Sequence, residues 1–332
     1  MVSEAISRIA TLRTRVTGAA RVLSADAVMS RALQIIAIAT LTIVGLFFLE
    51  LVVAGLPVLS KVGLGQFLFA NDWDIAHEVF GAWPLIVGTC ITSVIALLIG
   101  VPVAVGAAIY ITEFAPSRLR SVLALLLDLL AAIPSVVYGL WAVFILIPAL
   151  KPIEQWFADV FHFVPFIGGT VSGPNYFIAG LVLAIMIIPI VSAISREVIM
   201  TVPLAEKEAA LALGATRWEM IRLSIIPHSR AGIASAAMLG LGRAIGETIA
   251  VTLVIGNAAV IGSTIFSQGY TLAAVIANEF GEAGPGTIHA SALIAAGMVL
   301  FVLTLVVNGF ARALVLKRAV KQSGSVIDKA VA

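Results

Sequence analysis

The sequence is poor in charged residues, and this shortage excludes most soluble proteins. Only 11% of its 332 residues are charged, whereas a soluble domain carries about a quarter. A chain that is 61% hydrophobic cannot hide so much apolar surface in a water-soluble core of ordinary size. We therefore predict an integral membrane protein.

Cysteine, histidine and nucleotide-binding motifs are also scarce. The single cysteine, Cys90, excludes a disulfide within the chain and a cysteine cluster for a metal. No two of the four histidines share a helical turn, so we expect interfacial or loop positions for them and no metal site. No lysine follows a glycine, as the phosphate-binding loop of an ATPase requires. We expect no cofactor in this chain and no ATP hydrolysis by it.

Long apolar runs are what the sequence does contain. A bilayer core of about 30 Å needs roughly 20 residues of helix, and six stretches meet this requirement: Leu33–Leu56, Trp83–Ile111, Ser121–Leu150, Tyr176–Ser195, Ala231–Ile261 and Ala290–Phe310. The predicted fold class is an all-α polytopic membrane protein with six transmembrane helices. Because the first run is too long for a signal peptide, we expect it to be a retained span.

The basic residues outside these spans are unevenly distributed. With six spans, 17 lysines and arginines fall on one side of the membrane, and only Lys61 and Lys151 fall on the other. Basic loops are enriched on the cytoplasmic side, so we expect both termini there. The predicted organisation is a cytoplasmic segment (1–30), a first span with its external loop (31–81), a core (82–316) with a cytoplasmic loop at 201–230, and a cytoplasmic tail (317–332).

Charges inside the spans are costly, at about 2.5–3.5 kcal/mol each near a helix centre. Arg243 and Glu247 are four residues apart in the fifth span, which predicts that they share one helix face. They either neutralise each other as a structural clamp, or Arg243 contacts an anion through its planar fork while Glu247 holds the guanidinium in place. Asp128, in the third span, either partners Arg243 or is hydrated near the cytoplasmic interface.

Glycine and proline interrupt several spans. Pro134 and Gly139 lie in the third span, and Pro189 lies in the fourth. Proline bends a membrane helix and glycine lets helices approach closely, so we interpret these three residues as hinge positions. The pattern favours a transporter or a channel over a passive anchor.

The loop between the fourth and fifth spans predicts two short helices. An alanine- and leucine-rich segment from Glu208 indicates the first helix, and Gly214 is a plausible stop for it. Thr216 can cap the second helix, because Glu219 follows three residues later and completes a capping box. Pro227 is expected to mark the end of the second helix.

This loop resembles the Glu-Ala-Ala loop in the membrane subunits of ABC importers. The residues in register are Glu208, Ala209, Ala210, Gly214 and Pro227. The chain departs from the pattern at Ser224 and Ile226, where isoleucine and leucine are usual. The resemblance implies a type I ABC importer permease fold. It also implies that the loop, including Arg217, is a coupling helix that docks on a separate ATPase.

Two further segments resemble the phosphate-specific branch of these permeases. They are Ala131–Trp141 (AAIPSVVYGLW) and Gly242–Thr252 (GRAIGETIAVT), and the second is similar to the C-type subunit rather than the A-type. Sulfate and molybdate permeases usually carry Phe-Gly where this chain has Thr248 and Ile249. We place Arg243, Glu247, Thr248 and Asp128 on the predicted transport pathway.

The resemblance also implies partners and a location. The expected partners are a second, A-type permease, a dimer of ATP-binding subunits that hold ATP and magnesium, an extracytoplasmic phosphate-binding protein, inorganic phosphate and the lipid bilayer, but no nucleic acid. The expected location is the bacterial inner membrane. A sulfate or molybdate permease and a non-transporting membrane scaffold or sensor remain as alternatives, whereas an ion channel would have no use for the docking loop.

Overall fold

The computed structural model describes the backbone of residues 2–331 and the side chains of residues 28–310, 312 and 313. The chain divides into two compact units, Met1–Val53 and Ala54–Ala332. The first unit is part of one long helix, α1 (Val2–Val62). The residues of α1 from Ala54 onward are assigned to the second unit. The functional segments predicted from the sequence (1–30, 31–81, 82–316 and 317–332) stay predictions.

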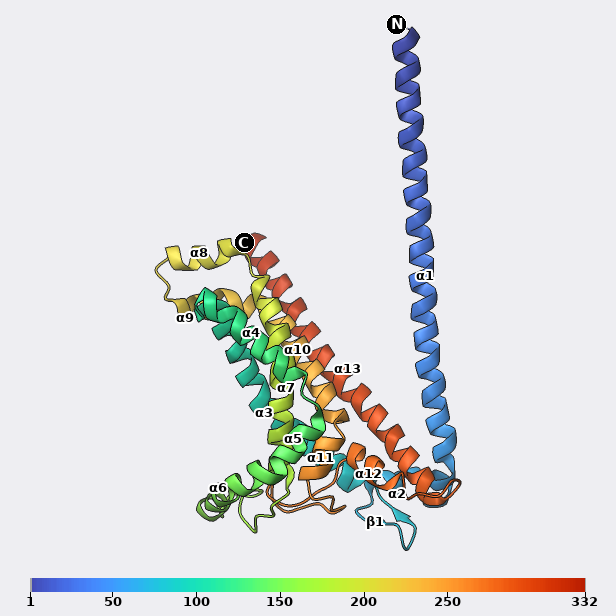
Figure 1. Ribbon diagram of the computed structural model, residues 1–332, viewed down its shortest axis with the longest axis vertical. Helices are drawn as coiled ribbons and strands as arrows, with labels where there is room; N and C mark the ends of the chain where they lie inside the picture. Colours follow the sequence, from blue (N-terminus) through green and yellow to red (C-terminus); the bar gives the residue numbers. More distant parts are fainter. Residues whose placement is uncertain (1, 332) are drawn as a thin grey trace. The chain divides into compact units, whose positions relative to one another are not determined.

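The second unit is helical apart from one short antiparallel hairpin (Figure 1). Three of its elements, η1 to η3, are single π-helical turns. In chain order after α1 the elements are α2 (Leu64–Phe69), β1 (Trp73–Asp74), β2 (Val79–Phe80), α3 (Trp83–Ile109), η1 (Tyr110–Phe114), α4 (Ser117–Ala131), α5 (Ser135–Trp141), η2 (Ala142–Leu146), α6 (Ile147–Val160), α7 (Tyr176–Met200), α8 (Leu204–Ala212), α9 (Arg217–Met220), η3 (Ile221–Ile225), α10 (Ile226–Gly246), α11 (Ile249–Val254), α12 (Leu272–Glu279) and α13 (Ile288–Val331).

Five helical stretches in the described part of the chain are long and apolar enough to cross a membrane. They are Val28–Val62, Trp83–Phe114, Ser135–Val160, Tyr176–Met200 and Ile288–Phe310. Four of them contain or closely match the first, second, fourth and sixth spans predicted from the sequence. The other two predicted spans differ from the structure, because each is interrupted.

The predicted third span, Ser121–Leu150, is broken at Pro134. Helix α4 ends at Ala131 and α5 begins at Ser135, with an extended backbone at the proline. Proline has no N–H to give to the carbonyl four residues earlier, and the hydroxyl of Tyr138 donates to this Leu130 oxygen at 2.8 Å instead. Beyond the break the apolar helix continues to Val160, past the predicted end at Leu150.

The predicted fifth span, Ala231–Ile261, is also two helices. Helix α10 ends at Gly246, and α11 begins at Ile249 after two non-helical residues. The serines, glycines and two arginines of α10 lower its mean hydropathy, so this helix is not among the five apolar stretches. It nevertheless packs as a bundle helix against α3, α7 and α13.

The centre of the second unit is the pair α3 and α7. Helix α7 carries the largest number of buried residues among the described helices, between Tyr176 and Ile199. Glycines set its closest contacts: a Cβ at Gly180 would lie 2.5 Å from the Cβ of Ile95 on α3. Farther along α7, a Cβ at Gly240 of α10 would lie 2.8 Å from Val191. Small residues thus bring three helices to backbone contact distance.

The two ends of this bundle carry different structures. Helices α8 and α9 lie at one end, and the hairpin, α6 and α12 lie at the other (Figure 1). At the hairpin end the carboxylate of Glu279 accepts a hydrogen bond from Trp73 Nε1 and lies 3.0 Å from His289 Nε2. This one carboxylate therefore joins the hairpin to α12 and α13.

The packing of α3 on α7 predicts a difference between two glycine substitutions. Gly180→Ala would force Ile95 and the α3 backbone away from α7, which overpacking data place at about 1–3 kcal/mol. Gly106→Ala on α3 is the matched control, because a Cβ there meets nothing within 4 Å. We expect a lower thermal unfolding temperature in detergent for Gly180→Ala only. Equal unfolding temperatures for the two variants would contradict this packing.

Candidate functional site

The loop after α7 folds as two short helices around a glycine turn, as the sequence predicts. Helix α8 is followed by Gly214 at φ +86°, a left-handed conformation that favours glycine. Thr216 and Glu219 form the predicted capping box: the Thr216 N–H donates to Glu219 Oε2 at 2.8 Å, and the Glu219 N–H donates to Thr216 Oγ1 at 3.3 Å. Hydrogen bonds from the Thr216 backbone and hydroxyl lower the pKa of Glu219.

The expectation that Pro227 ends the second helix was wrong. Helix α9 passes through the π turn η3 into α10, so the backbone is helical from Arg217 to Gly246. Pro227 lies in the first turn of α10, directly after the π turn, where a missing N–H is tolerated. The second helix of the loop and the start of the interrupted fifth span are therefore one continuous element.

An open hollow of about 770 Å³ lies between α8 and the η3–α10 segment, and Ala209, Ala210, Gly214 and Pro227 are among its lining residues. Large apolar side chains are exposed at the hollow and beside it: Leu213 is 90% exposed, Leu223 67% and Trp218 61%. The side chains of Glu208 and Arg217 are exposed. An exposed apolar surface of this kind is typical of a protein-binding site.

Ser224, where the chain departs from the family pattern, has a structural role here. Its hydroxyl donates to the carbonyl oxygen of Glu206, at the start of α8, at 3.3 Å. His228 lies 3.5 Å from the Glu206 carboxylate on the same side of the hollow. With serine at position 224, the two halves of the loop therefore remain joined by a hydrogen bond.

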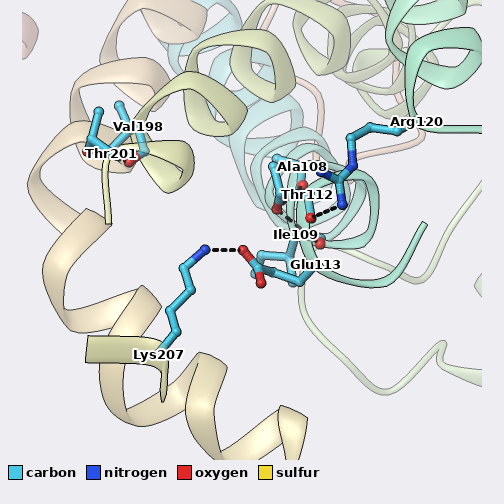
Figure 2. A network of polar contacts seen from close by, with 8 residues as sticks. All are labelled: Ala108, Ile109, Thr112, Glu113, Arg120, Val198, Thr201 and Lys207. Atoms are coloured by element: carbon cyan, nitrogen blue, oxygen red, sulfur yellow. Dashed lines mark hydrogen bonds and ion pairs between the residues drawn. The ribbon is translucent and has the colours of Figure 1, made fainter. Parts of the chain in front are cut away.

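The loop is fixed to the ends of α3 and α7 by apolar and charged contacts. A separate buried cluster joins the two helices to the loop, and it comprises Ala108, Ile109, Ile199, Val202, Met220, Ile221 and Ile225. Beside it, Lys207 Nζ of α8 lies 2.6 Å from Glu113 Oε1 of η1 (Figure 2). Both side chains are largely buried, at 17% and 12% exposed, so this ion pair is shielded from solvent.

Sequence reasoning missed this ion pair. Lys207 and Glu113 are separated by 94 residues, and neither belongs to a motif. Figure 2 shows how the end of α3 is held in place: Arg120 donates to the carbonyl oxygen of Thr112, one residue before Glu113, at 2.7 Å. Only the folded backbone brings these side chains together.

Arg243 lies in the last turn of α10 and lines a second cavity of about 770 Å³ between α7, α10 and α13. It forms no hydrogen bond or ion pair with any residue whose side chain the structure describes. Within the described part of the chain, the guanidinium therefore has no competing partner.

The expectation that Arg243 and Glu247 share a helix face was wrong, because α10 ends at Gly246. The backbone of Glu247 is extended, with ψ 129°, and its carboxylate accepts a hydrogen bond from the Ala250 N–H at 3.4 Å. Glu247 therefore binds the first turn of α11 rather than the guanidinium. The mutual clamp is not the arrangement in this structure.

The remaining pathway candidates lie at different places. Thr248 stands in the break between α10 and α11, and its hydroxyl donates to the carbonyl oxygen of Gly246 at 3.2 Å. Asp128 is exposed on α4 and forms no ion pair with Arg243. The structure thus brings Thr248 near the end of α10, whereas Asp128 is not joined to Arg243.

The proposed hinge residues have distinct surroundings. Pro134 separates α4 from α5, and a Cβ at Gly139 would lie 2.7 Å from Leu253 of α11. The second halves of the two interrupted spans therefore pack directly against each other. Pro189 is buried inside α7, which remains one helix across it.

Comparison with known proteins assigns this arrangement to a family. Residues 100–320 match the family described as binding-protein-dependent transport system inner membrane component. The phosphate transport system permease protein PstC of Mesorhizobium japonicum is 41% identical over 297 residues, covering 88% of this chain and 90% of the relative. The protein PstC 2 of Mycobacterium tuberculosis is 46% identical over 257 residues, covering 75% of this chain and 77% of the relative.

Solved structures agree on the fold. A chain of the bacterial alginate ABC transporter, crystallised with an alginate-bound periplasmic protein, superposes with a TM-score of 0.54 at 20% identity. The superposition covers 82% of this chain and 91% of that chain, so the architecture is that of a type I ABC importer permease. The apolar helices and the family match together show that this is a multi-pass membrane protein. The chain belongs to the PstC family of binding-protein-dependent transport system inner membrane components.

Proposed function

We propose that this chain is a permease subunit of an ATP-driven phosphate importer and forms half of the translocation pathway. The observation that carries the proposal is the 41% identity to a phosphate permease across 88% of the chain. The free guanidinium of Arg243 at a cavity supports it, because the planar fork of arginine binds two oxygens of an oxyanion at once. Thr248 and Ile249, in place of Phe-Gly, favour phosphate over sulfate and molybdate.

In this proposal the loop Leu204–Ile225 couples the permease to the ATPase. The exposed apolar surface of α8 and α9 docks on a separate ATP-binding subunit, which holds ATP and magnesium and carries out the hydrolysis. Movement of the loop reaches α10 through the continuous helix from Arg217, and it reaches α3 and α7 through the buried cluster and the Lys207–Glu113 ion pair. All three central helices thus respond to one docking event.

The other half of the pathway comes from an A-type permease, and an external binding protein delivers phosphate. The complex lies in the bacterial inner membrane, with the loop and both termini of this chain in the cytoplasm. The many exposed apolar side chains of the spans, such as Leu98 at 70% and Phe144 at 73%, suit contact with lipid or with the second permease.

Substrate choice is tested with the complete complex in proteoliposomes. We expect ATP-dependent uptake of labelled phosphate, and no uptake of sulfate or molybdate at equal concentrations. Vesicles without the binding protein are the control. Uptake of sulfate but not phosphate would overturn the substrate assignment and leave the importer class intact.

If Arg243 binds two phosphate oxygens at once, a positive charge alone at this position is insufficient for phosphate uptake. Arg243→Lys keeps the positive charge but loses the planar fork, so we expect phosphate uptake to fall at least 10-fold while the complex still assembles. Arg118→Lys is the matched control, because Arg118 is exposed on α4 outside the cavity. Full uptake by Arg243→Lys would exclude two-oxygen recognition by this residue.

The Lys207–Glu113 ion pair predicts a coupling defect. A hydrogen bond between charged groups contributes about 1.5–3 kcal/mol, so Glu113→Gln should loosen α8 from the end of α3. We expect several-fold less phosphate transported per ATP hydrolysed, with partial recovery when Glu113→Lys is combined with Lys207→Glu.

The control for this pair is Glu197→Gln, near the same end of α7. Glu197 is 67% exposed, and its contact with Arg196 is long, at 3.8 Å. We expect a normal ratio of phosphate to ATP for this variant. A normal ratio for Glu113→Gln as well would show that the buried ion pair does not transmit the movement.

A further inference from the structure

The cavity beside Arg243 contains a second arginine, Arg312, from a different helix. On α13 the residues that line the cavity are Leu305, Asn308, Gly309 and Arg312, which follow each other at helical spacing and form one face. On α10 the lining residues run from Ser235 to Arg243 with the same spacing. The two faces are adjacent, because a Cβ at Gly242 would lie 3.8 Å from Asn308 Nδ2.

The charge of this cavity is not balanced by the described part of the chain. No acidic residue is among the residues that line it, and neither arginine forms an ion pair with a described side chain. The amide of Asn308 also forms no hydrogen bond with a described residue. Two cationic forks and one amide donor thus line an open cavity with no anionic partner among the described residues, and this is the donor set that recognises a phosphate-class oxyanion.

We propose that Arg312, with Asn308, forms a second oxyanion-binding station in the phosphate pathway, next to Arg243. This inference rests on the proposed function as a phosphate permease. Arg312 lies two helical turns beyond Leu305 on the α13 face of the cavity. In this proposal the phosphate group passes from Arg243 along the groove between α10 and α13 to Arg312. A pair of stations lets one guanidinium release the anion while the next one binds it.

An anionic lipid headgroup carries the same phosphate chemistry and is the competing source of a ligand. Leu239 and Leu305, at 56% and 59% exposed, flank the cavity, so acyl chains could reach it in the isolated chain. Transport in vesicles of different lipid charge separates the two sources, because a lipid site depends on anionic lipid and a pathway site does not.

The test compares Arg312→Gln, Arg312→Lys and the control Arg118→Gln in the complete complex. Each complex is purified by size exclusion to confirm assembly, and phosphate uptake and ATP hydrolysis are measured in phosphatidylcholine vesicles with and without phosphatidylglycerol. We expect uptake to fall at least 10-fold for Arg312→Gln and less for Arg312→Lys, in both lipids. ATP hydrolysis should persist, and Arg118→Gln should match the wild type.

Three results would overturn the inference while the wild type still imports phosphate. They are normal uptake by both Arg312 variants, a defect confined to vesicles with phosphatidylglycerol, and an equal defect in Arg118→Gln. If the wild type imported sulfate instead, the proposed function would fail. The same variants measured with sulfate would then decide whether Arg312 contacts the transported oxyanion.

Discussion

The close approach of α3 and α7 is the contact on which the other elements depend. Glycine at position 180 allows the two backbones to meet, and α10 joins α7 through Gly232 and Gly240. The loop Leu204–Ile225 leaves from α7 and returns as α10, so both ends of the loop are anchored in this packed triplet. In a bilayer, apolar burial between helices gives little driving force, and tight van der Waals contact has to supply the stability.

The two interrupted spans follow from the same packing. A broken helix exposes backbone groups, and this is tolerated at membrane depth only where protein covers the break or a cavity lies beside it. At Pro134 the released Leu130 carbonyl receives the Tyr138 hydroxyl, and at Glu247 the carboxylate binds the first turn of α11. The halves α5 and α11 then pack on each other at Gly139. The breaks are thus stabilised by local hydrogen bonds and by each other.

Local signals in the sequence predicted the loop well. The glycine turn at Gly214 and the capping box of Thr216 and Glu219 depend on neighbouring residues alone, and both are confirmed. The class of the fold and four spans follow from apolar length, which is equally local. The breaks were missed because an apolar run looks the same whether its helix is continuous or interrupted. The Lys207–Glu113 pair depends on tertiary packing that no spacing encodes.

Arg243 has no carboxylate partner among the described side chains, and under the proposed function this matters for transport. A guanidinium held by Glu247 would have to break an ion pair before it could bind phosphate, and that cost would slow every cycle. Here Glu247 accepts a hydrogen bond from the Ala250 N–H, so in the proposed pathway Glu247 would not compete with phosphate for the guanidinium. A pathway site must also release its ligand, so binding has to be modest. In the proposed pathway, arginines at an open cavity meet both requirements better than an enclosed cage of donors would, and high affinity is then left to the external binding protein.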